Sequence, residues 1–182
     1  MILSFYSAIN LQCLKLANCH KILERSFCEV VRNFPQLEVL DISECVLSTE
    51  SLEVVGQSCP LLKVLKLVRS RIQYRVYDVD DDEAFVIAKT MTGLRHLNII
   101  GNELSNVGLL AILDGCPLLE TLDIRRCYNL NLSESLRKRC LKQIKDLRLP
   151  IVYNYEDYCY DDDDRVYYQD SLIDDDCYDP FD

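Results

Sequence analysis

Three aspartates at alternate positions, Asp78, Asp80 and Asp82, have the clearest spacing for metal chemistry in this sequence. A calcium loop of the EF-hand type that starts at Asp78 needs glycine at its sixth position and glutamate at its twelfth. Those positions hold Glu83 and Lys89. The pattern therefore favours a solvated acidic loop, and we expect no metal site there.

The ten cysteines and two histidines are the other candidates for metal or nucleophilic chemistry. The cysteines form no Cys-x-x-Cys pair, and their closest spacings, Cys13 to Cys19 and Cys19 to Cys28, are wider than those of zinc ligands. His20 and His96 belong to no Ser/His/Asp pattern, and the five glycines form no phosphate-binding loop. We expect no catalytic residue, no cofactor and no metal, and therefore no enzyme.

Charge and hydropathy argue against several classes of function. Residues 151–182 carry twelve acidic side chains and one basic one, whereas the preceding 150 residues carry 18 acidic and 19 basic side chains. Neither part has the basic patch that binding of nucleic acid or anionic lipid requires. No apolar run approaches the roughly 18 residues of a membrane span, and no signal peptide is apparent. We expect an intracellular protein of the cytoplasm and/or nucleus, with reduced cysteines and with neither nucleic acid nor membrane as partner.

A repeated leucine pattern supplies the elements that would position any functional side chain. Six segments read Leu-x-x-Leu-x-Leu, with isoleucine allowed: residues 11–16, 37–42, 62–67, 94–99, 119–124 and 144–149. Their first residues lie 26, 25, 32, 25 and 25 positions apart, which fits the period of leucine-rich repeats except in one long unit. The expected fold is α/β: a leucine-rich-repeat solenoid of parallel strands backed by helices, with the horseshoe form of the ribonuclease-inhibitor type.

Residues between the strands predict turns and helices. Cys19, Cys45 and Cys127 stand three positions after a strand's last leucine or isoleucine, where a small polar group turns the chain and bonds to neighbouring backbone. We therefore interpret these cysteines as structural thiols. Helices are predicted after Ser48 and Ser105, which are typical capping residues, and a further helix is predicted from Ala84 to Ala88. Each of the first two helices ends before a Cys-Pro-Leu-Leu motif.

The domain organisation follows from where the pattern begins and ends. We expect an N-terminal edge or cap at residues 1–10, a repeat domain at 11–150 and a disordered acidic tail rich in tyrosine at 151–182. The long unit contains an acidic insertion near residues 74–83.

Outward strand positions are the best candidates for function. Successive strand residues point to opposite faces, so the residues between the leucines form rows on the exposed side of the sheet. Solenoids use such concave surfaces for binding. The candidate partner-binding residues in these rows are Lys15, Asp41, Lys66, His96, Asn98, Asp123, Arg125 and Arg148. The alternative is that alternating charges only keep an exposed sheet soluble.

Several motifs resemble a plant subgroup of the F-box/leucine-rich-repeat proteins. They are Asp81-Asp-Glu-Ala84, Ala88-Lys-Thr-Met91, Gly93-Leu-Arg-His-Leu97, Gly115-Cys-Pro117, Leu122-Asp-Ile-Arg-Arg-Cys-Tyr-Asn129 and Lys145-Asp-Leu-Arg148. The resemblance covers roughly residues 11–150. It implies the substrate receptor of a cullin–RING (SCF-type) ubiquitin ligase, in which an F-box module docks on a Skp adaptor and the repeats hold the protein to be ubiquitinated.

The sequence departs from that family at its start. Only ten residues precede the first repeat, too few for an F-box, and no Leu-Pro-x-Asp/Glu element followed by an amphipathic helix occurs. We expect the F-box to be absent from this chain, which leaves two readings of its function. It is either the substrate-recognition part of a ligase receptor, with adaptor and cullin implied by family only, or a stand-alone interaction protein that acts without recruiting a ligase, such as a competitive regulator or a truncated product. The bound protein is not identified by the sequence.

Overall fold

Each repeat places three residues in a β-strand, and the strands form one six-stranded sheet. The computed structural model describes residues 10–19, 21–45, 47–69 and 79–150. The strands are β1 (Cys13–Lys15), β2 (Val39–Asp41), β3 (Val64–Lys66), β4 (His96–Asn98), β5 (Thr121–Asp123) and β6 (Asp146–Arg148). All neighbouring pairs are parallel, and the order in the sheet is the order in the sequence.

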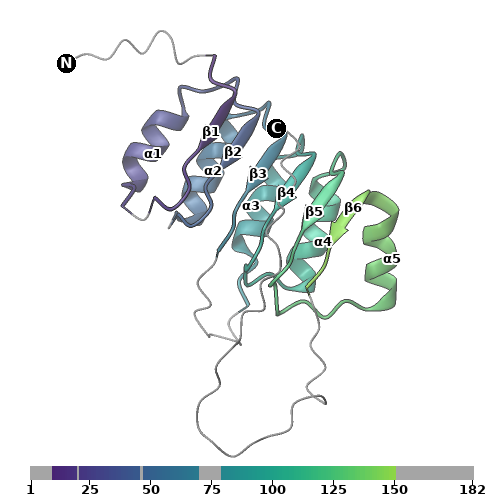
Figure 1. Cartoon of the computed structure of the whole chain (residues 1–182). Helices are drawn as coiled ribbons and strands as arrows, with labels where there is room; N and C mark the ends of the chain where they lie inside the picture. Colours follow the sequence, from purple (N-terminus) through teal and green to yellow (C-terminus); the bar gives the residue numbers. More distant parts are fainter. Residues whose placement is uncertain (1–9, 20, 46, 70–78, 151–182) are drawn as a thin grey trace, which may run out of the picture. The chain divides into compact units, whose positions relative to one another are not determined.

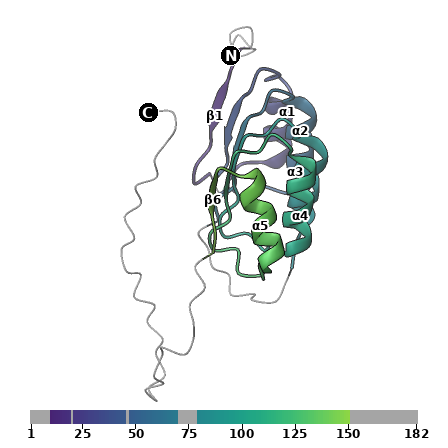
Figure 2. The same cartoon turned by 90° about the vertical axis from the view of Figure 1, so that its right-hand side faces the viewer.

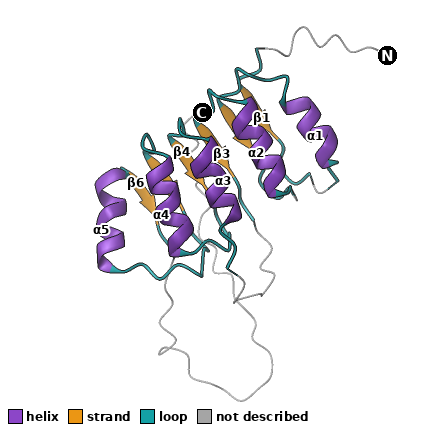
Figure 3. Cartoon of the chain, turned by 180° about the vertical axis from the view of Figure 1, so that it is seen from behind, coloured by secondary structure: helices purple, strands orange, loops and turns teal. Residues whose placement is uncertain are grey.

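Five helices lie on one side of this sheet, as Figures 1, 2 and 3 show. They are α1 (Glu24–Val31), α2 (Thr49–Ser58), α3 (Asp82–Thr90), α4 (Asn106–Gly115) and α5 (Glu134–Gln143). Helix α3 begins at Asp82, two residues before the predicted start and inside the predicted insertion. Residues 74–78 of that insertion, residues 1–9 of the predicted cap and the acidic tail lie outside the described residues. The predicted class, a leucine-rich-repeat solenoid, is confirmed.

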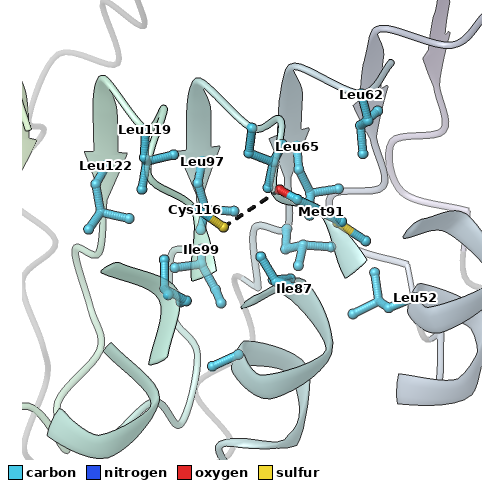
Figure 4. Packing of buried hydrophobic residues seen from close by; sticks show 14 of the residues in the cluster. Leu52, Leu62, Leu65, Ile87, Met91, Leu97, Ile99, Cys116, Leu119 and Leu122 are labelled. Atoms are coloured by element: carbon cyan, nitrogen blue, oxygen red, sulfur yellow. Dashed lines mark hydrogen bonds between the residues drawn. The ribbon is translucent and has the colours of Figure 1, made fainter. Parts of the chain in front are cut away.

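The core lies between the sheet and the helices, where the repeated leucines meet helical side chains. Leu65, Leu97 and Leu122 are each 0% exposed at the middle of their strands. Figure 4 shows such strand leucines facing Ile87 and Leu52, which come from α3 and α2. Burial of each leucine side chain contributes about 1.5–3 kcal/mol, so the period of the leucines fixes the register of all six strands.

Serine caps start three of the helices. Ser48 Oγ accepts a hydrogen bond from the Ser51 amide at 3.4 Å, and Ser105 Oγ accepts one from the Val107 amide at 3.0 Å. Ser133 caps α5 in the same way. Because the first amides of a helix have no partner within it, these hydroxyls fix where each helix begins. The predictions for Ser48 and Ser105 are confirmed.

Tight turns follow strands β1, β2, β4 and β5. Asn18, Glu44, Gly101 and Arg126 occupy the same position of their repeats, and all four have positive φ, between 57° and 70°. Gly101 is required there for a second reason, because a Cβ would lie 2.2 Å from the carbonyl oxygen of Arg69. Within the described residues, no helix is long and apolar enough to cross a membrane.

Candidate functional site

The predicted outward row forms a continuous ladder on the side of the sheet away from the helices, which we call the strand face. Its six rungs, one from each strand, pair in register in the order Lys15, Asp41, Lys66, Asn98, Asp123 and Arg148. Parallel strands lie about 4.8 Å apart, so the rungs are close enough to contact one partner together. The structure thus brings these six predicted residues together.

Arg125 joins the ladder through Asp123, which is only 4% exposed. Its Nε lies 3.0 Å from Oδ1 of Asp123, and its Nη2 lies 2.8 Å from Oδ2. On the other side, Arg148 Nη1 lies 3.8 Å from Oδ2 of the same carboxylate. One shielded carboxylate therefore holds two guanidinium groups at the β5–β6 end of the ladder. A bidentate pair of this kind fixes the orientation of the guanidinium group and strengthens the interaction between the two side chains.

The β2 end of the ladder is organised differently. Oδ1 of Asp41 accepts hydrogen bonds from the Ser43 amide at 3.0 Å and from the Ser43 hydroxyl at 2.6 Å. These bonds within the turn help to satisfy the carboxylate. Lys66 and Asn98, the next rungs, are half-buried between the two ends.

His96 lies in the neighbouring ladder, where its Cα is paired with that of Thr121. Its Nδ1 is 2.9 Å from the Thr121 hydroxyl. Burial lowers the pKa of His96 below 6.5, and the nearby charge of Arg95 lowers it further, whereas Glu120 opposes both. A neutral imidazole at pH 7 acts here as a hydrogen-bonding surface group beside the Thr121 hydroxyl.

Sequence reasoning missed a row of charges just before the strands, which we call the margin row. Glu120 accepts from Arg95 Nη1 at 2.6 Å and from Lys145 Nζ at 2.7 Å. The bonds from Lys145 and then Arg95 lower the pKa of Glu120. Glu38 and Lys63 form a similar pair at 2.7 Å. The occurrence of charged residues of both signs at one repeat position was the available signal.

Sequence reasoning also missed a buried carboxylate at the start of α3. Glu83 pairs with Arg69, and its Oε2 accepts from Asn102 Nδ2 at 2.6 Å. Burial raises the pKa of Glu83, which the charge of Arg69 and the bond from Asn102 oppose. The contacts tie α3 to the turns that follow β3 and β4, so this network has a structural role.

Metal chemistry finds little support in the described part of the chain. There, no group of three His, Cys, Asp or Glu side chains is arranged to hold a metal ion. Asp80 accepts from the Asp82 amide at 3.0 Å, and Asp81 binds the hydroxyl and amide of Ser105, so these carboxylates serve the starts of helices. Asp78 lies outside the described residues.

A hollow beside Glu83 has space of only about 10 Å³ for water-sized molecules. Ligand pockets measure roughly 300–1,000 Å³. The hollow is therefore too small to hold a cofactor or a metabolite.

The structural interpretation of the cysteines is supported at two of its three positions. Cys45 Sγ donates to the carbonyl of Leu16 at 2.6 Å, and Cys127 Sγ donates to that of Ile99 at 3.0 Å. Each thiol thus ties its turn to the repeat before it. Cys19, in the first described repeat, donates to the carbonyl of Ala17 within its own turn, at 3.5 Å. The eight cysteines of the described residues are free thiols.

Comparisons with known proteins agree with the resemblance inferred from the motifs. F-box/LRR-repeat protein 23 of Arabidopsis thaliana is 49% identical over 141 residues, which cover 78% of this chain and 31% of that protein. F-box protein SKIP19 of the same plant is 48% identical over 141 residues, covering 78% of this chain and 45% of that protein. F-box protein SKIP1, also from this plant, is 32% identical and covered to 53%. The chain thus spans about a third to a half of the length of these curated relatives.

The remaining comparisons concern protein family models and solved structures. No protein family model matches the chain. Among solved structures, the crystal structure of the TLR13–ssRNA13 complex is similar with a TM-score of 0.38 and 15% identity, over 81% of this chain and 30% of that one. The identities to the Arabidopsis proteins, together with the six repeats, show that the chain belongs to the plant F-box/leucine-rich-repeat proteins.

Proposed function

We propose that this chain binds a protein through its strand face, as the substrate-recognition part of an F-box subunit of a cullin–RING ubiquitin ligase. The observation that carries the proposal is the six-rung ladder, in which polar and charged side chains stand in register on the side of the sheet opposite the described helices. Extended surfaces of this kind are the binding surfaces of solenoid proteins.

The composition of the ladder suits recognition of a protein surface. Charges of both signs stand along it beside the neutral amide of Asn98, and Arg148, Asn98 and the adjoining Arg125 present hydrogen-bond donors. Arginine is enriched at protein interfaces, because one side chain both stacks and forms several hydrogen bonds. Binding alone accounts for these features without a chemical step.

In this proposal, residues 11–150 act as the recognition domain, and the acidic tail at residues 151–182 is not part of it. Recruitment of the ligase through a Skp adaptor is suggested by the F-box names of the Arabidopsis relatives.

The test begins with partners found by proximity labelling in plant cells, followed by binding measurements with each purified partner. Lys66→Glu changes the middle of the ladder, and Lys89→Glu makes the same change of charge on α3, where Lys89 is 73% exposed and pairs with Glu53. We expect Lys66→Glu to weaken binding at least tenfold and Lys89→Glu to change it less than twofold. Loss of binding in the α3 variant alone would place the interface on the helices and overturn the proposal.

Ligase recruitment needs its own measurement. The full chain is co-purified with a Skp adaptor, and the lifetime of the partner is followed with and without a proteasome inhibitor. We expect a complex, and a partner lifetime that shortens when the chain is expressed. A bound partner of unchanged lifetime, together with no adaptor complex, would show an interaction protein that does not recruit a ligase.

A further inference from the structure

Basic side chains outnumber acidic ones around the last three strands of the strand face. The outward and margin positions of β4–β6 and the turn after β5 hold five basic residues, Arg95, Arg125, Arg126, Lys145 and Arg148. They hold three acidic residues, Glu120, Asp123 and Asp146. The excess of two positive charges contrasts with the net charge of -10 of the whole chain.

The acidic groups are also less exposed than the basic groups that they bind. The side chain of Asp123 is 5% exposed, whereas those of Arg125 and Arg148 are 35% and 39% exposed. A partner that approaches the strand face therefore meets the guanidinium groups before it meets the carboxylate between them.

The margin row repeats this arrangement at the other end of the same strands. The side chain of Glu120 is 29% exposed, whereas those of Arg95 and Lys145 are 47% and 75% exposed. Asp146 is the exception at 56%, and it lies 3.5 Å from Arg148 Nη2. Two carboxylates thus each hold two basic groups, and both sets present positive charge outward.

This geometry lowers the cost of binding an anion. An arginine that is already held by a buried carboxylate loses less side-chain freedom when a ligand arrives. Its guanidinium group matches the planar carboxylate of Asp or Glu, to which it forms charge-assisted hydrogen bonds. Attraction between opposite charges also speeds the encounter of two proteins and selects against basic partners.

We infer that the β4–β6 end of the strand face binds an acidic segment of the partner protein, with Asp or Glu side chains on Arg125 and Arg148 and further ones on Arg95 and Lys145. The inference rests on the proposed function, because it names the chemistry of the partner for that same face. The two basic sets lie at opposite ends of strands β4–β6, so the segment runs along the strands, with carboxylates at both ends.

The experiment measures binding of the full chain to a fluorescent twelve-residue peptide of alternating Glu and Gly at low salt. Arg148→Glu removes one arginine of the cluster, and Arg25→Glu makes the same change of charge on α1, where Arg25 is 90% exposed. We expect Arg148→Glu to raise the Kd at least tenfold, Arg25→Glu to raise it less than twofold, and Arg148→Lys to give an intermediate value. A matched Gln and Gly peptide should not bind.

Three results would overturn the inference. Equal losses in Arg148→Glu and Arg25→Glu would show unspecific attraction, and equal binding of the Gln peptide would show that charge is not recognised. Binding of a phosphoserine and Gly peptide without binding of the Glu peptide would assign the site to phosphorylated partners.

The inference and the proposed function can fail separately. If the purified partner depends on Lys66 but is neither displaced by the Glu peptide nor weakened by Arg148→Glu, the partner is held by other chemistry and the proposed function stands. If neither Lys66→Glu nor Arg148→Glu weakens the partner while the Glu peptide still binds, the acidic site is real but the strand face is not the recognition surface.

Discussion

At the scale of single residues, several polar groups connect one repeat to the next. Burial raises the pKa of Cys127 to about 12, so the group stays protonated and continues to donate to the carbonyl of Ile99. Glu83 connects α3 to two successive turns through Arg69 and Asn102. In both cases, a buried polar group has found the partner that its burial requires.

Glu83 gives a prediction for stability and its pH dependence. Burial raises the pKa of Glu83 above 4.5, so its contribution to stability is largest below pH 4.5 and falls as the pH rises through the pKa of the folded state. Glu83→Gln keeps an acceptor for Asn102 without the charge, and its stability relative to the wild type should rise between pH 4.5 and pH 8. Glu83→Ala leaves Asn102 without that acceptor and should cost about 1–3 kcal/mol at pH 7.

Urea unfolding of both variants over this pH range is the measurement. Glu53→Gln, on the partly exposed carboxylate that pairs with Lys89, is the control and should change stability by less than about 0.5 kcal/mol. Equal costs for Glu83→Gln and Glu83→Ala would contradict the assignment, because they would show that the charge on Glu83 is needed.

At the scale of elements, helix starts are positioned by contacts between residues 24 positions apart in successive repeats. Glu24 Oε1 accepts from the Ser48 amide at 2.7 Å, and Asp81 Oδ1 accepts from the Ser105 amide at 2.8 Å. An acid of one repeat thus binds the helix start of the next. At the other helix ends, small residues allow close packing, and Gly115 of α4 lies against the backbone of Ala88 in α3.

The contact of Gly115 predicts a loss of stability on adding a methyl group. A Cβ at this position would lie 2.3 Å from the carbonyl oxygen of Ala88, so Gly115→Ala must push α3 and α4 apart. We expect a cost of about 1–3 kcal/mol, although alanine is the better helix former by about 1 kcal/mol. Thermal unfolding of the full chain measures it.

Gly93→Ala is the matched control. Its Cβ would meet its nearest atom, the carbonyl oxygen of Leu62, at an ordinary 3.7 Å. It should change stability by no more than about 1 kcal/mol, in either direction. A Gly115→Ala protein as stable as the wild type would show that the two helices have room to separate.

At the scale of the repeat domain, each repeat is held mainly by its two neighbours. Within the described residues, strands β2 to β5 have a partner on both sides, whereas β1 and β6 each have one. Burial of the mid-strand leucines follows the number of neighbouring strands. Leu14 and Leu147, in the end strands, are only partly buried, whereas the leucines of the inner strands are fully buried: Leu40, Leu65, Leu97 and Leu122. Stability in such a solenoid is close to a sum over repeats and their contacts.

Equivalent leucines should therefore have unequal effects. Leu97→Ala, in a central strand, should cost about 2–5 kcal/mol, because it leaves a cavity between two intact neighbours. Leu14→Ala, at the same position of β1, should cost less than half as much, because its side chain is already partly exposed. Free energies of unfolding from urea titrations compare the two. Equal costs would mean that the end repeat is as tightly packed as the centre.

Spacing along the chain was enough to predict the features that recur with the repeat. The inward leucines, the strand register, the caps Ser48 and Ser105 and the turn thiols Cys45 and Cys127 were all predictable, because each depends on local spacing or on one repeated neighbour. The family resemblance was also readable, since its motifs are short and continuous. Helix α3 was predicted too short, because the acidic residues before Ala84 read as a loop although they form its first turn.

Which charged groups pair, and which are buried away from solvent, depends on the fold and could not be predicted from the sequence. Arg95, Glu120 and Lys145 are 25 residues apart in sequence, and the sheet stacks them so that one carboxylate holds two cations. The burial of Asp123 and Glu83 depends on side chains of adjacent repeats. The physical reason is that pairing and burial of a charge depend on the direction of each side chain and on its neighbours across strands, which spacing along one chain does not specify.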